Sequence, residues 1–80
     1  MKYIIKFERK CKGKYKNKDI FYLIDNPLIS DNRCVTSNNI YAGYEFKLFD
    51  ARLIVSLFLQ RFIHFNHTDF NIKIEKCPIY

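Results

Sequence analysis

Residues 50–65, DARLIVSLFLQRFIHF, decide the fold because they hold the clearest periodic pattern in the chain. Asp50 is a preferred N-cap residue, and Phe49 and Ile54 fit a hydrophobic staple around it. At 100° per residue the apolar side chains form one stripe about 100° wide, as on a helix that packs against a core. The stretch therefore predicts one amphipathic helix, Asp50–Phe65, which ends at residues 66–68. Its core stripe consists of Ala51, Ile54, Val55, Phe58, Phe62 and Phe65.

Three other stretches predict strands. Residues 2–8, KYIIKFE, and residues 70–76, FNIKIEK, alternate with period two, which is typical of a strand with one buried face. Residues 19–24, DIFYLI, are apolar on both faces and predict a more central strand. In the first strand we expect Ile4 on the outward side with the lysines. The side chains expected to face the core are Tyr3, Ile5 and Phe7 from the first strand and Phe70, Ile72 and Ile74 from the last.

The segment between the second strand and the helix is the least regular part of the chain. Asp25-Asn26-Pro27 favours a turn. Residues 33–36 allow a short strand, and residues 40–46 predict either a third strand or an ordered approach to the helix. Together the elements predict a single α+β domain over residues 1–80. It would be a small antiparallel sheet of three to four strands packed on one helix, in the order ββ(β)αβ.

The positive charge is concentrated at the beginning of the chain. Residues 1–18 carry eight Lys or Arg and one acid, a formal charge of +7, whereas residues 19–80 sum to −1. A localised positive edge attracts anions at long range and loses that attraction as salt rises. Phosphate backbones and acidic protein surfaces are the two classes of partner that fit.

Most of these cations lie in residues 9–18, RKCKGKYKNK, between the first two predicted strands. We expect a hairpin whose basic tip projects from the sheet, with Gly13 and Asn17 as turn-capable residues. Tyr15 could stack on a base or sugar, and lysine favours loose attraction to phosphate. The alternative is a solvated edge that resists aggregation. The candidate residues for contact with a partner or with phosphates are Arg9, Lys10, Lys12, Lys14, Tyr15, Lys16 and Lys18.

A second candidate surface is the back of the predicted helix. Leu53, Leu57 and Ile63 lie off the core stripe, among polar residues. Such apolar positions would fit a partner surface or a homodimer seam. The alternative is that residues 25–45 cover them.

The cysteines and histidines form no recognised site in the sequence. Cys11, Cys34 and Cys77 are odd in number and without a C-x-x-C pair, which favours reduced thiols, although one disulfide would fit an oxidising compartment. His64 and His67 lack a Cys or acid at zinc-finger spacing, so we expect no metal and no cofactor. With no set of catalytic residues either, we expect a protein that is not an enzyme.

The sequence predicts neither a membrane span nor a signal peptide. The longest apolar zone, residues 48–65, is interrupted by charged and polar residues, and the apolar run after Met1-Lys2 is short. We therefore expect no membrane contact and a location in the cytoplasm of the host cell.

Several segments together give the chain a family resemblance. The N-terminal strand KYIIKF (2–7), the KGKY turn (12–15), Phe49-Asp50-Ala51 at the start of the only helix and the terminal strand IKIE (72–75) resemble short orphan proteins of phages and mobile elements, including anti-CRISPR inhibitors. The resemblance implies a compact α+β protein that binds host machinery stoichiometrically, and it carries over no site residues. Many such inhibitors are acidic mimics of DNA, whereas this chain is basic. It would therefore engage an acidic surface or a bound guide nucleic acid.

Two functional hypotheses follow. In the first, the protein is a monomer or homodimer that inhibits a host defence nuclease complex, a host protein or ribonucleoprotein, through its basic hairpin. In the second, it is an accessory protein whose hairpin contacts the phosphates of RNA or DNA. Binding to phosphates makes log affinity fall with log salt, with a slope of about −0.7 to −0.9 per phosphate, so salt dependence separates the two.

Overall fold

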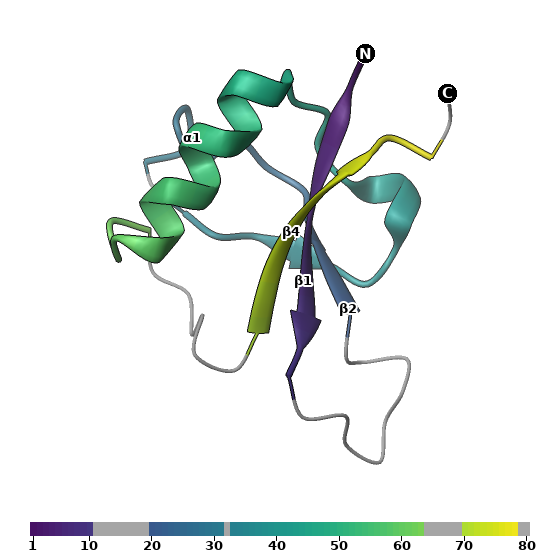
Figure 1. Ribbon diagram of the computed structural model, residues 1–80, viewed down its shortest axis with the longest axis horizontal. Helices are drawn as coiled ribbons and strands as arrows, with labels where there is room; N and C mark the ends of the chain where they lie inside the picture. Colours follow the sequence, from purple (N-terminus) through teal and green to yellow (C-terminus); the bar gives the residue numbers. More distant parts are fainter. Residues whose placement is uncertain (11–19, 32, 64–69, 79–80) are drawn as a thin grey trace.

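The computed structural model describes residues 1–10, 20–31, 33–63 and 70–78. It is an α+β fold in which one helix packs on a four-stranded antiparallel sheet of order β3-β2-β1-β4. This confirms the predicted fold class. Figure 1 shows α1 lying across one side of the sheet and the 3-10 turn η2 on the other side. The elements are β1 (Tyr3–Arg9), β2 (Ile20–Leu23), β3 (Thr36–Ser37), η2 (Ile40–Ala42), α1 (Leu48–Leu59) and β4 (Phe70–Lys76).

The sheet is organised around β1, which has a neighbour on each side. It pairs antiparallel with β4 over seven residue pairs, from Tyr3 opposite Lys76 to Arg9 opposite Phe70. On its other side it pairs antiparallel with β2, so the first two strands are joined as predicted. β4 has the bounds expected from its alternation. The predicted central strand, β2, does lie inside the sheet, between β1 and β3.

The main core lies between the sheet and α1. Phe7 from β1 and Phe58 from α1 are both fully buried, and their rings meet edge to face with centroids 5.2 Å apart. Ile5, Leu23, Ala51 and Ile54 are buried around them, and Ile72 and Ile74 pack against this cluster from β4. The buried positions of α1 recur every three or four residues, so the helix presents one apolar face to the sheet, as the sequence predicted.

The opposite face of the sheet carries a second, smaller core. Ile4 is only 1% exposed, and it packs with Tyr22 and Cys77 beneath the η2 turn. Our expectation that Ile4 faces outward beside the lysines is therefore wrong. The approach is close: a Cβ built on Gly43 would lie 3.0 Å from Cγ2 of Ile4, so a larger residue would force Ile4 to move by a few tenths of an ångström. The strand β1 is buried on both faces at this end.

The start of the helix differs from the prediction. α1 begins at Leu48, after Lys47 as the N-cap, and Lys47 makes no capping hydrogen bond with its side chain. Asp50 lies within the first turn, where its carboxylate complements the helix dipole instead of capping it. The predicted staple is also absent, because Phe49 is 78% exposed. The early start follows from Phe46, whose backbone exchanges two hydrogen bonds with Tyr3 and fixes the chain just before the helix.

The helix also ends earlier than Phe65. Arg61 has a φ of 64°, its N–H donates to the carbonyl of Phe58, and the N–H of Phe62 donates to the carbonyl of Leu57. These two bonds form a Schellman motif, in which the left-handed residue is usually glycine. With arginine there, the sequence carries no stop signal. Phe62 is consequently exposed, and Ile63 turns back into the core at 1% exposure; Phe65 lies outside the described residues.

The segment between β2 and α1 is ordered by short-range contacts. The side chain of Asn26 accepts a hydrogen bond from the N–H of Leu28, as expected for the predicted turn. The short strand is β3, at Thr36–Ser37, displaced toward the C-terminus from residues 33–36. Residues 40–46 form an ordered approach to the helix through η2 and the bridge between Phe46 and Tyr3.

Replacement of Phe58 by alanine should lower the free energy of unfolding by about 3–5 kcal/mol, because it opens a cavity beneath Phe7. Phe49→Ala is the matched control: it removes the same side chain from the same helix, but from an exposed position. The control should change stability by about 0.5 kcal/mol or less. Urea unfolding of both variants measures the difference, and equal losses would mean that the helix is wrongly oriented.

Arg61→Gly should raise the free energy of unfolding by about 1 kcal/mol, because glycine adopts the left-handed conformation of residue 61 without steric cost. Gln60→Gly should be destabilising, since Gln60 has a φ of −85° and gains nothing from glycine. Thermal or urea unfolding compares the two neighbours. A destabilised Arg61→Gly variant would contradict the helix end described above.

Candidate functional site

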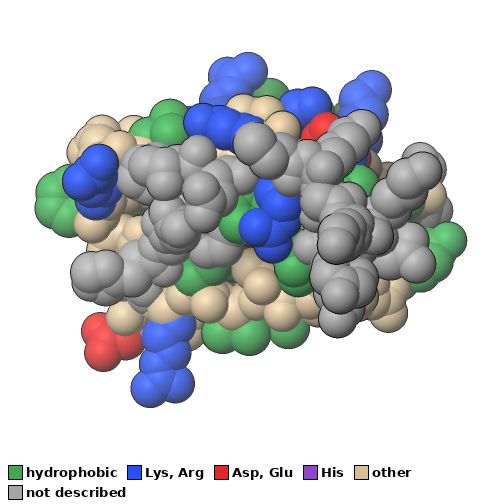
Figure 2. All heavy atoms as spheres, turned by 90° about the horizontal axis from the view of Figure 1, so that it is seen from below, with side chains coloured by type: hydrophobic (Ala, Val, Ile, Leu, Met, Phe, Trp, Pro, Cys, Tyr) green, Lys and Arg blue, Asp and Glu red, His purple; other side chains and the backbone are tan. Residues whose placement is uncertain are grey.

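The basic end of the sheet is where β1 ends and β4 begins. Lys10 is exposed there, directly after Arg9 at the end of β1. Figure 2 views the molecule from this end of the sheet. Lysine and arginine side chains lie around the rim of this view and near its centre, and fewer acidic side chains are visible. Of the seven candidate contact residues, the structure thus places two at this end of the sheet. The others, Lys12, Lys14, Tyr15, Lys16 and Lys18, lie outside the described residues.

Arg9 is held by an aromatic ring. Its guanidinium carbon lies 4.8 Å from the ring centroid of Phe70, the residue directly opposite in β4. Phe70 in turn meets Phe21 edge to face, with centroids 5.9 Å apart. Both rings are half-buried. A cation and two partly accessible aromatic side chains therefore meet at the basic end of the sheet, a combination that the alternation pattern alone did not indicate.

The face of the sheet away from α1, called the open face below, carries a charge cluster beside the second core. The cluster consists of Lys6, Glu8, Lys73 and Glu75. The Nζ atom of Lys6 lies 3.0 Å from Oε1 of Glu75 and 3.8 Å from Oε2 of Glu8. The Nζ atom of Lys73 lies 3.2 Å from the same Glu8 oxygen. The cluster is formally neutral, so these two lysines do not add to a uniform positive sheet face.

The Lys6 ammonium is the most enclosed of these groups, with 17% of its side chain exposed. Its hydrogen bond to Glu75 raises the pKa of Lys6 above the ordinary lysine value, partial burial opposes this, and the negative charges of Glu75 and Glu8 add to the increase. The charged form of Lys6 is therefore stabilised by the fold.

The second candidate surface is not a single surface. Leu53 is 41% exposed on α1, but Leu57 is half-buried against the main core and Ile63 is almost fully buried. The prediction that Ile63 belongs to an interface is wrong, because the helix ends before it and the chain turns inward. Leu57 packs in part on the core and is otherwise exposed, so its predicted role in an interface stays a prediction.

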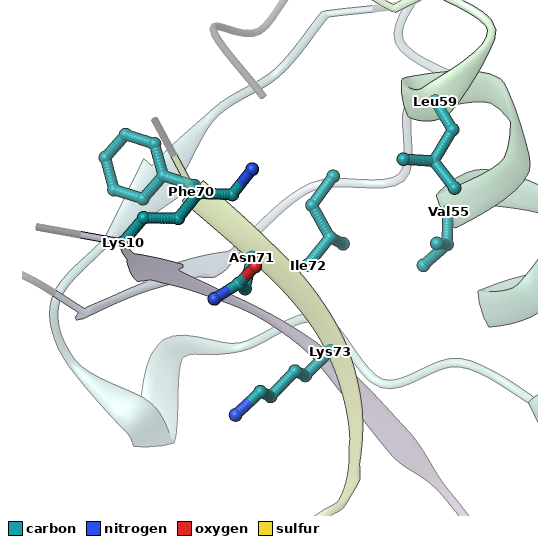
Figure 3. A pocket seen from close by; sticks show the side chains of 7 residues that line it. All are labelled: Lys10, Val55, Leu59, Phe70, Asn71, Ile72 and Lys73. Carbon is teal, nitrogen blue, oxygen red and sulfur yellow. The ribbon is translucent and has the colours of Figure 1, made fainter. Parts of the chain in front are cut away.

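A groove runs between α1 and β4, with a volume of about 530 Å³. Figure 3 shows Val55 and Leu59 extending from the helix toward Ile72 on β4, while Lys10 lies beside Phe70 at one end. Val55 was assigned to the core stripe, and Leu59 was assigned no role. The sequence could not show this groove, because it depends on β4 lying at the edge of the sheet under the helix.

The two described cysteines are free thiols. Burial raises the pKa of the Cys34 thiol to about 11, which keeps it protonated and unreactive at neutral pH. The Sγ atom of Cys77 lies 3.4 Å from a carboxylate oxygen of Glu45. Cys11 lies outside the described residues. Neither described thiol is therefore placed to act as a nucleophile.

Two further findings concern the described ranges only. Within them, no group of three or more His, Cys, Asp or Glu side chains is placed to hold a metal ion. His64, His67 and Asp69 fall outside these ranges. In the same part of the chain, no helix has the length and apolar character needed to cross a membrane.

Comparison with protein-family models, with curated proteins and with solved structures found no match to this chain.

Stability should fall more steeply at high pH in the wild type than in Lys6→Gln. Since the folded pKa of Lys6 is raised, its stabilising effect is complete below the unfolded value of about 10.4 and is lost as pH rises through the folded value. Glutamine keeps a donor but has no charge. We expect a wild-type advantage of about 0.5–1 kcal/mol at pH 8 that disappears near pH 12.

Urea unfolding from about pH 8 to pH 12 measures this difference. Lys47→Gln, at an exposed lysine outside the cluster, serves as the control and should follow the wild type. A constant difference between wild type and Lys6→Gln over the whole range would show that the Lys6 charge is not stabilised by the fold.

Proposed function

We propose that this protein is a non-enzymatic inhibitor of the phage or mobile-element type, which binds a host defence nuclease complex stoichiometrically, as anti-CRISPR proteins do. Its contact residues are Arg9 and Lys10 at the basic end of the sheet, followed in the sequence by Lys12, Lys14, Tyr15, Lys16 and Lys18. The bound surface on the complex is acidic, or is the guide nucleic acid that the complex holds.

One observation carries this proposal: the positive charge is segregated along the sequence, with +7 in residues 1–18 and −1 in residues 19–80, and Arg9 and Lys10 lie at one end of the sheet. Lys6 and Lys73 are paired with Glu75 and Glu8, so the charge cluster on the open face is neutral. Proteins that bind free single strands use a positively charged groove along which the backbone runs. A neutral sheet face with a basic end favours a local contact with an anionic site on a larger complex.

A second function, binding of free nucleic acid, is favoured by the aromatic rings at the same end. The guanidinium group of Arg9 lies over Phe70, and Phe21 is adjacent. Partly exposed rings beside cations can stack on unpaired bases. This candidate differs from the first in the partner it needs, since it requires no host protein.

The test is inhibition of cleavage by guide-loaded CRISPR nuclease complexes, alongside binding to free single- and double-stranded RNA and DNA in a salt titration. We expect inhibition of at least one complex near equimolar protein, and weak binding to free nucleic acid at physiological salt. Tight binding to free RNA or DNA with a steep salt slope would support the second function. Neither inhibition nor binding would remove both.

Charge reversal locates the surface. Lys12→Glu, Lys14→Glu and Lys16→Glu together should abolish inhibition. The matched control is Arg33→Glu, Lys47→Glu and Arg52→Glu, which changes net charge by the same amount at exposed positions outside residues 9–18. The control should retain most of the inhibition. Equal losses in the two triple variants would show that net charge, and not the basic end, is responsible.

A further inference from the structure

The strand β4 lies at an edge of the sheet. It pairs with β1 over its whole length, and among the described strands it has no second neighbour. An edge strand of seven residues presents backbone N–H and C=O groups that can pair with another chain. Its position makes β4 the longest edge in the described sheet.

The hydrogen bonds around β1 determine which residues of β4 present these groups. Tyr3 exchanges two backbone bonds with Phe46 on the side of β1 away from β4. The backbone N–H and C=O groups of successive residues point to alternate sides of a strand. Those of Ile4 and Lys6 in β1 therefore point toward β4. The backbone groups of their partners, Glu75 and Lys73, therefore point back toward β1. The outward groups belong to the residues between them, above all Ile72, Ile74 and Lys76.

The charges of β4 are self-complementary in one antiparallel register. A two-fold axis at Ile74 places Lys73 of each copy opposite Glu75 of the other. An axis at Lys73 would instead place two Lys73 side chains opposite each other, and like charges in direct opposition are destabilising. The side chains of Lys73 and Glu75 are 51% and 39% exposed, so each can form a second ion pair besides those to Glu8 and Lys6.

The groove supplies apolar surface beside the same edge. Leu59 is 60% exposed, and it faces Ile72 across the groove together with Val55. In the register centred on Ile74, Lys76 of the second copy lies opposite Ile72. The strand of the second copy would therefore run along this groove and cover its apolar side chains, which adds burial to the backbone hydrogen bonds.

We propose that the protein forms a two-fold homodimer through antiparallel pairing of β4 with β4 of a second copy, centred on Ile74. The proposal concerns a surface outside the basic end and does not depend on the proposed function. It also differs from the seam expected on the back of the helix, where Ile63 is almost fully buried and Leu57 packs in part on the core.

Complementary charge variants test this register. Lys73→Glu alone puts two carboxylates opposite each other at both pairs, and Glu75→Lys alone puts two ammonium groups there. We expect wild type to show twice the 9.7 kDa chain mass by sedimentation equilibrium at low salt, and each variant alone to show the single mass. An equimolar mixture of the two variants restores both opposite-charge pairs and should recover the double mass.

The mixture distinguishes repulsion at the interface from damage to the fold, because misfolded chains would not be rescued by each other. Lys76→Pro is an independent variant: it removes an outward N–H, which proline tolerates at a sheet edge, and should also give the single mass. The proposal fails if the wild type has the single mass at every concentration. It also fails if either charge variant alone keeps the double mass, or if the mixture stays at the single mass.

Discussion

The pairing of β1 with β4 is the interaction on which the rest of the structure depends. It joins the first and last strands of the chain along their full lengths, so it closes the fold across almost the whole sequence. The helix packs over these two strands, with Phe58 on Phe7. The charge cluster on the open face exists only because Lys6 and Lys73 are opposite each other. Closing so long a loop costs entropy, which the burial of Ile5, Phe7 and Ile74 must offset.

The sequence predicts the elements where the pattern is local and complete. The bounds of β4 are those of its alternating segment, because period two and β-branched residues predict a strand without reference to the rest of the chain. The helix is predicted in kind but not in its ends. Arg61 adopts a conformation that usually calls for glycine, and the start depends on the distant contact between Phe46 and Tyr3. Ile4 was misassigned for a similar reason, since only the folded chain brings η2 over it.

The candidate site is predicted less well than the fold, for a physical reason. Counting charges along the chain identifies the basic segment, but it does not show which cations are neutralised across strands. Lys6 belongs to the basic run in sequence and to an ion-paired cluster in space. The groove beside β4 likewise depends on the order of the strands in the sheet, which the periodicity of a single strand does not predict.

The close approach of Lys2 and Cys77 has a practical consequence. The N–H of Cys77 donates to the carbonyl of Lys2, so the start of β1 and the end of β4 lie at the same end of the sheet, as Figure 1 shows. Arg9 lies at the far end of β1, about 20 Å from Tyr3 at roughly 3.4 Å per residue. A bead, a surface or a fluorophore coupled near residue 2 therefore points away from the basic end. Immobilised protein would present that end outward in a uniform orientation, and the attachment would stay clear of any partner bound there.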